Sequence, residues 1–147
     1  MKDTKSYLSK IVQDMPDSGI KDVANTMEGA LSLGVGEPDF PTPEHVREAA
    51  IASIKKGDTK YTDNRGTVEL RAAAADYLTK FDLHYDKQDE ILITMGASEG
   101  IDLALRTLVN PGEEVLVAEP SYVSYIPCIE LCGGVPVSLK LRAENKF

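Results

Sequence analysis

The sequence predicts an α/β fold, and two observations carry that prediction. From Glu90 onward, short apolar runs alternate with longer stretches of helical periodicity, as in strands that alternate with helices. Pro111-Gly112 and Gly133-Gly134 follow the two helical stretches, where a helix must end before the next strand. We therefore expect three strands and two intervening helices, in the order strand 91–94, helix 97–109, strand 114–118, helix 122–131 and strand 135–141.

The amino-terminal segment, Met1 to about Thr26, reads as an arm that lies outside the core. A short helical pattern around residues 7–12 is broken by Pro16 and Gly19. Glycines and prolines are then dense over residues 34–43, which favours an extended loop over a surface, and loops of this kind often line sites.

Two helices are expected between this loop and the first strand. Thr42 is the candidate cap of the first, with Pro43 at its first position and Gly57 near its end. The second begins around Thr67. Its apolar residues recur at three- and four-residue spacing and predict one face toward a core: Leu70, Ala73, Ala74, Tyr77, Leu78 and Phe81.

Composition narrows the class of protein. The chain has 147 residues, 42% of them hydrophobic, which allows a real core. Its net charge of −8 argues against a nucleic-acid partner, and no stretch approaches the length of a membrane span or a secretory signal, so we expect a cytoplasmic protein. Cys128 and Cys132 lie four residues apart on one predicted helix face, and we interpret them as buried reduced thiols with no metal.

The turn from Gly96 to Gly100 is the strongest candidate site, because a strand, a glycine turn and a helix start form a phosphate cradle. The same residues fit Gly-x-Ser-x-Gly, the nucleophile elbow of α/β-hydrolases, but His45 and His84 both precede Ser98, against the chain order of that family. A third interpretation is an ordinary strand-to-helix connection with Ser98 as the helix cap.

Three more segments bear on the choice, namely Leu33 to Pro43, Lys60 to Arg71, and Glu119-Pro-Ser-Tyr-Val-Ser-Tyr125. With the cradle between them, they resemble the pyridoxal-phosphate aminotransferases of classes I and II, from about Ile20 to Leu141. The resemblance implies an arm and substrate-side loop over 1–42 and the first, partial section of the cofactor-binding large domain over 43–147.

The resemblance also implies roles for individual residues. Gly96, Ala97 and Ser98 would hold the cofactor phosphate, and the ring of Tyr122 would lie against the pyridine ring. Tyr61 resembles a residue that crosses a two-fold interface to the partner subunit's phosphate, which implies a homodimer. Gly36 resembles a backbone position near the substrate carboxylate, and Ile20 resembles an apolar residue that covers the substrate.

The lysine that binds the cofactor covalently is not recognisable in this sequence. Ser53-x-x-Lys56 fits the family's Ser-x-x-Lys by letter, but it precedes the cradle, and we interpret its lysines as solvated. We therefore expect an inactive amino-terminal fragment of an enzyme acting on an amino acid and a 2-oxo acid. Whether the fragment keeps the cofactor is open. A carbon–sulfur lyase of the same fold and a non-catalytic cofactor-binding or regulatory module remain alternatives.

Overall fold

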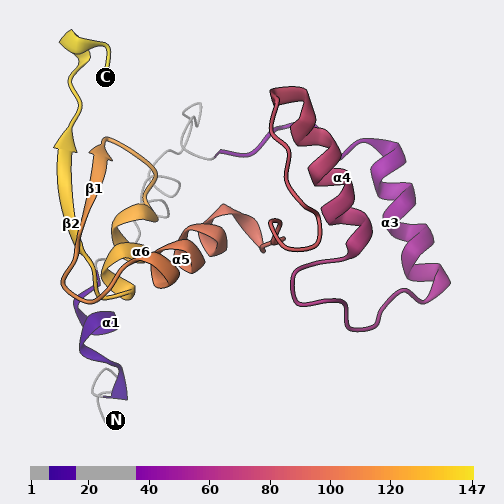
Figure 1. Cartoon of the computed structure of the whole chain (residues 1–147), viewed down its shortest axis with the longest axis horizontal. Helices are drawn as coiled ribbons and strands as arrows, with labels where there is room; N and C mark the ends of the chain where they lie inside the picture. Colours follow the sequence, from indigo (N-terminus) through magenta and orange to yellow (C-terminus); the bar gives the residue numbers. More distant parts are fainter. Residues whose placement is uncertain (1–6, 16–35) are drawn as a thin grey trace, which may run out of the picture. The chain divides into compact units, whose positions relative to one another are not determined.

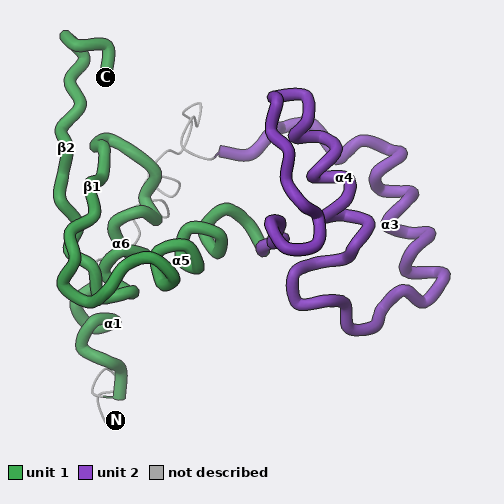
Figure 2. Tube along the Cα trace, viewed as in Figure 1, with its two compact units in different colours: residues 1–26, 95–147 green, residues 27–94 purple. Residues whose placement is uncertain are grey.

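The computed structural model describes residues 7–15 and 36–147, which belong to two compact units. One unit is Met27–Thr94, and the other combines Met1–Thr26 with Met95–Phe147 (Figure 1; the units are purple and green in Figure 2). The expected division at residue 42 stays a prediction. Within the described residues, none of the helices combines the length and the apolar character that a membrane span requires.

The unit Met27–Thr94 is helical in its described part. It contains α3 (Glu44–Lys56), α4 (Val68–Leu78) and the short 3-10 helix η2 (Thr79–Phe81). Helix α3 begins one residue later than expected, because Pro43 rather than Thr42 takes the cap position, and it ends at Gly57 as predicted. The Thr67 hydroxyl accepts a hydrogen bond from the Leu70 N–H (3.3 Å), which confirms the start of α4.

The buried face of α4 differs from the predicted one. Its most buried side chain is Arg71, 1% exposed, followed by Ala74 and Leu78 on the same face. Leu70, Ala73, Tyr77 and Phe81, which were expected in a core, are exposed. Arg71 is buried because its guanidinium finds hydrogen-bond acceptors in two loops, at Gly66, Lys87 and Gln88.

The other unit is built around a small parallel sheet. Its elements, in chain order, are α1 (Lys10–Asp14), α5 (Gly96–Leu108), β1 (Glu114–Glu119), α6 (Tyr125–Leu131), β2 (Val135–Lys140) and the 3-10 helix η3 (Ala143–Asn145). Strands β1 and β2 pair in parallel, from Glu114 opposite Val135 to Glu119 opposite Lys140. Helix α6 packs on both strands and on α5, and the buried core consists of Val117, Cys128 and Ile129.

The mixed α/β class is confirmed, with one strand fewer than expected. Residues 91–94 do not form a strand, and the Ile93 N–H donates to the Arg65 carbonyl (3.0 Å) in a neighbouring loop. Helix α6 starts at Tyr125, so Tyr122 lies in the turn that precedes it. Cys128 and Cys132 are free thiols; Cys128 is buried as expected, whereas Cys132 is only half-buried.

Candidate functional site

Helix α5 begins at the glycine turn that the sequence singles out. Gly96 has a φ of +80° and is the first helical residue, so Ala97 and Ser98 lie in the first turn. N–H groups in the first turn of a helix have no carbonyl acceptor within the helix, and the aligned peptide dipoles add partial positive charge there. Among the described residues, a Cβ added at Gly96 would meet nothing within 4 Å beyond its chain neighbours and the backbone of its own helix.

A hydrogen bond joins the start of α5 to the turn after β1. The hydroxyl oxygens of Ser98 and Tyr122 lie 2.9 Å apart, although the residues are 24 positions apart in the sequence. The Tyr122 ring also meets the Tyr125 ring edge-on, with centroids 5.6 Å apart and planes at 81°. Two predicted site residues, Ser98 and Tyr122, therefore come together. The Tyr122 side chain is held by Ser98 at its hydroxyl and by Tyr125 at its ring.

Hydroxyl groups and the Glu99 carboxylate lie around the start of α5 and Tyr122. Hydrogen bonding with the Ser124 hydroxyl, and then with Ser98, lowers the pKa of the Tyr122 phenol from its usual value. The carboxylate of Glu99 accepts a hydrogen bond from the Met95 N–H, just before the helix. Glu99 thus satisfies one backbone donor beside the turn.

A cavity adjoins Tyr122 on the side of the turn and α6. Its volume is about 390 Å³, and its lining is mixed: Glu119, Pro120, Ser121, Tyr122, Val123, Ile126, Pro127 and Glu130. The Tyr122 side chain is therefore accessible, and the residue is 49% exposed. An aromatic ring that packs against a second ring and adjoins a cavity suits a planar ligand.

The geometry bears on the hydrolase alternative. A nucleophilic serine requires a hydrogen-bonded base, and the described partner of the Ser98 hydroxyl is the Tyr122 phenol. His84 instead lies 3.3 Å from the Asp82 carboxylate, in the unit Met27–Thr94. The described contacts of Ser98 therefore do not form a serine–histidine pair.

The remaining predicted residues lie elsewhere in the chain. Tyr61 and Gly36 belong to the unit Met27–Thr94, where Gly36 is exposed and Tyr61 is completely exposed at 107%. Their assigned roles stay predictions. Ile20 lies outside the described residues. Lys56 of the Ser-x-x-Lys match is exposed and lies 3.2 Å from the Asp58 carboxylate, as expected for a solvated lysine.

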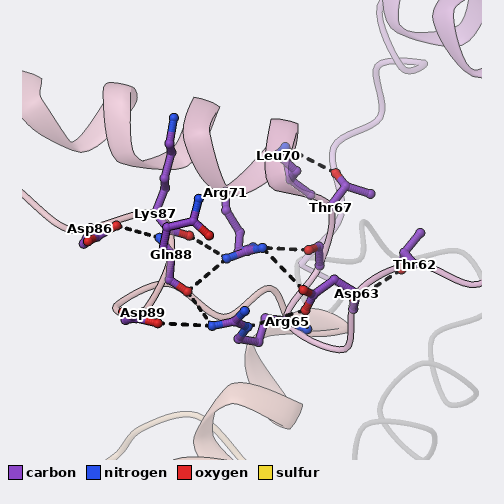
Figure 3. A network of polar contacts seen from close by, with 11 residues as sticks. Thr62, Asp63, Arg65, Thr67, Leu70, Arg71, Asp86, Lys87, Gln88 and Asp89 are labelled. Carbon is purple, nitrogen blue, oxygen red and sulfur yellow. Dashed lines mark hydrogen bonds and ion pairs between the residues drawn. The ribbon is translucent and has the colours of Figure 1, made fainter.

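A polar network that involves the loop of residues 60–66, which contains Tyr61, was not predicted from the sequence. Arg71 and Arg65 bind backbone carbonyls and carboxylates of two loops (Figure 3). One signal was available, because Arg71 lies beside the predicted apolar face of a helix that has leucine and alanine neighbours. A charged residue next to such a face is a candidate for burial with partners.

Comparison with known proteins shows the relationship of the chain. The family model described as aminotransferase class I and II matches residues 28–147. YugH of Bacillus subtilis, which carries the name of an aminotransferase, is 49% identical over 97% of this chain and 38% of its own length. Aromatic-amino-acid aminotransferase 2 of Thermococcus litoralis is 43% identical over 86% of this chain and 33% of its own.

A solved structure gives the same relationship. The aspartate aminotransferase of Thermotoga maritima superposes with a TM-score of 0.82 at 35% identity, over 95% of this chain and 39% of that one. The chain therefore spans little more than a third of the length of these relatives.

Proposed function

Because residues 28–147 match its family model, the chain belongs to the class I and II aminotransferases, and we propose that it forms the amino-terminal part of such an enzyme. The enzyme would move an amino group between an amino acid and a 2-oxo acid with pyridoxal phosphate as cofactor. When bound, this cofactor supplies an electron sink for the reacting carbon of the amino acid. The observation that carries the proposal is the hydroxyl contact of 2.9 Å between Ser98 and Tyr122.

The start of α5 has the donors that a phosphate dianion needs. The N–H groups of Ala97 and Ser98 and the Ser98 hydroxyl supply neutral donors next to the positive end of the helix dipole. Gly96 has no side chain that would take up space beside these donors. The residues present therefore fit a phosphate group, with Ser98 held in place by Tyr122.

Tyr122 would hold the pyridine ring. Its own ring is held by the T-shaped contact with Tyr125 and, at its hydroxyl, by Ser98, so little side-chain freedom is lost when a flat ligand stacks on it. Stacking of this kind contributes about 0.5 to 1.5 kcal/mol beyond the burial of area.

The other assignments rest on the family resemblance. We propose that Tyr61 reaches the cofactor phosphate of a second subunit in a homodimer, that the Gly36 backbone approaches the substrate carboxylate, and that Ile20 covers the substrate. The exposure of Tyr61 and Gly36 leaves both available for such contacts. The cytoplasmic location expected from the sequence stays a prediction.

The phosphate site is tested with pyridoxine 5′-phosphate, which lacks the aldehyde and so forms no adducts with lysines. Equilibrium dialysis of the 147-residue chain should show saturable binding of this ligand and much weaker binding of pyridoxine. Ser98→Ala should weaken binding by about 1 to 2 kcal/mol, roughly 5- to 30-fold in Kd, as is typical for a hydrogen bond to a charged group.

Two variants make the test specific. Tyr122→Phe keeps the ring and should weaken binding less than Tyr122→Ala, because only the latter loses the stacking surface. Ser53→Ala is the matched control, since Ser53 lies in α3 and its hydroxyl is 3.4 Å from the Asp58 carboxylate. Equal affinity of the wild type and Ser98→Ala would contradict the assignment of the cradle.

A further inference from the structure

Arg71 is the buried charged residue in the described part of the chain, and it contacts Asp63 in the loop of residues 60–66 (Figure 3). The side chain extends from the first turns of α4 and is 1% exposed. Burial of an unpaired guanidinium is strongly unfavourable, so its partners must be good acceptors. The acceptors that it finds show what the residue holds together.

Two segments contribute the acceptors of Arg71. Its Nε–H donates to the Gly66 carbonyl (3.2 Å), and its Nη1 donates to the carbonyls of Lys87 (2.6 Å) and Gln88 (3.1 Å). Its Nη2 lies 3.7 Å from the Asp63 carboxylate. One side chain therefore joins the loop before α4 to the turn that follows η2.

Arg65 forms a second layer of the same network. Its N–H donates to the Asp63 carboxylate (2.8 Å), and its Nη1 donates to the Gln88 carbonyl (2.5 Å) and lies 3.4 Å from the Asp89 carboxylate. The Arg65 carbonyl accepts the Ile93 N–H (3.0 Å). The Asp63 carboxylate thus contacts both Arg65 and Arg71, and these contacts fix the backbone two residues after Tyr61.

This network matters because the loop has no regular structure to hold it. Residues 60–66 form neither helix nor strand, so their conformation depends on side-chain bonds such as those of Arg71. The Tyr61 side chain is completely exposed, so the backbone conformation of its own loop determines where the ring lies. Rotational freedom of that backbone would be lost on every binding event that uses Tyr61.

We propose that Arg71 is a positioning residue that fixes the loop of residues 60–66 and thereby presents Tyr61 in one orientation to its ligand. Where it concerns the ligand, a phosphate, the inference rests on the proposed function. Where it concerns the loop, it rests on the contacts alone. A lysine at this position keeps the charge but loses the planar fork that reaches Gly66, Lys87 and Asp63 together.

The loop is tested first, without any ligand. The sequence contains no tryptophan, so Tyr61→Trp supplies a single fluorescent reporter on the loop. In that background Arg71→Lys should increase the amplitude of nanosecond depolarisation by about twofold in time-resolved anisotropy, as a flexible loop requires. Arg106→Lys is the matched control, because Arg106 pairs with Asp102 (2.8 Å) within α5 of the other unit and should leave the reporter unchanged.

A general loss of stability would produce a different result. Anisotropy is measured well below the unfolding transition of each variant, which is followed separately by circular dichroism. A lowered Tm with unchanged anisotropy at residue 61 would overturn the proposal, since Arg71 would then only stabilise the unit. Asp63→Asn should loosen the reporter in the same direction as Arg71→Lys but less, because the carbonyl bonds of Arg71 remain.

The ligand is tested with a double-mutant cycle in the full chain. Arg71→Lys should weaken binding of pyridoxine 5′-phosphate by about three- to tenfold when Tyr61 is present and have little effect when Tyr61→Phe is present, as for coupled residues. Additive losses would overturn the positioning of Tyr61. Absence of binding by the wild type would instead refute the proposed phosphate site, and the anisotropy result would then decide the role of Arg71 in the loop.

Discussion

Gly66 gives a quantitative test of how the loop before α4 is packed. Its φ is +93°, and a Cβ added there would lie 2.5 Å from Cγ1 and 2.6 Å from Cβ of Ile93. Gly57, at the end of α3, has a similar φ of +85° but no atom within 4 Å of its added Cβ. The two substitutions Gly66→Ala and Gly57→Ala therefore share the backbone strain and differ in the steric clash.

The magnitudes follow from these two terms. Left-handed backbone costs an L residue about 1 to 2 kcal/mol, which is the whole expected effect of Gly57→Ala. At Gly66 the clash is with a branched side chain close to its own backbone, and overpacking of this kind adds about 1 to 3 kcal/mol. Gly66→Ala should therefore lower the free energy of unfolding by about 2 to 5 kcal/mol.

Urea unfolding followed by far-ultraviolet circular dichroism measures both variants. If Gly66→Ala does not fold, Gly66→Ala combined with Ile93→Ala removes the clashing atoms and should lose less stability than the sum of the two single variants. Losses for Gly66→Ala and Gly57→Ala that agree within about 0.5 kcal/mol would refute the packing of Gly66 on Ile93.

Three further predictions concern ionisable groups. Hydrogen bonds from the N–H and side chain of Arg65 lower the pKa of the Asp63 carboxyl below its ordinary value of 3.8. The ionised carboxylate therefore stabilises the fold above pH 3.8, and this stabilisation is lost as the pH falls through the lowered pKa. Asp63→Asn should abolish that part of the acid dependence of unfolding. Ser98→Ala should raise the pKa of Tyr122 in a phenol titration, and an unchanged titration would contradict the hydroxyl contact. Burial raises the pKa of the Cys128 thiol, so iodoacetamide should alkylate it more slowly in the folded chain than in urea, and equal rates would contradict its burial.

Local signals in the sequence predicted the helices well. Thr67 caps α4 and Gly57 ends α3 as expected, because both depend on bonds to residues three or four positions away. The prediction of the buried face of α4 was wrong. It missed the burial of Arg71, whose partners Lys87 and Gln88 are 16 and 17 residues away. Spacing along one helix carries no information about such partners.

The local part of the candidate site was predictable from the sequence, and its long-range contacts were not. The turn at Gly96 and the backbone N–H groups after it are local features of a glycine and a helix start. The hydrogen bond between Ser98 and Tyr122 spans 24 residues and depends on how α5 and the turn after β1 pack. Glu99, which accepts from the Met95 N–H, was also missed, since the pattern of the cradle does not specify this position.

We propose above all that the first turn of α5 binds the phosphate of a vitamin B6 cofactor. Titration of the ¹⁵N-labelled chain with pyridoxine 5′-phosphate, followed through backbone amide shifts, tests it most directly. The account predicts that the amides of Gly96, Ala97 and Ser98 shift together and saturate, and that pyridoxine without the phosphate leaves them in place. Saturable shifts confined to other residues, with these three amides unmoved, would contradict it.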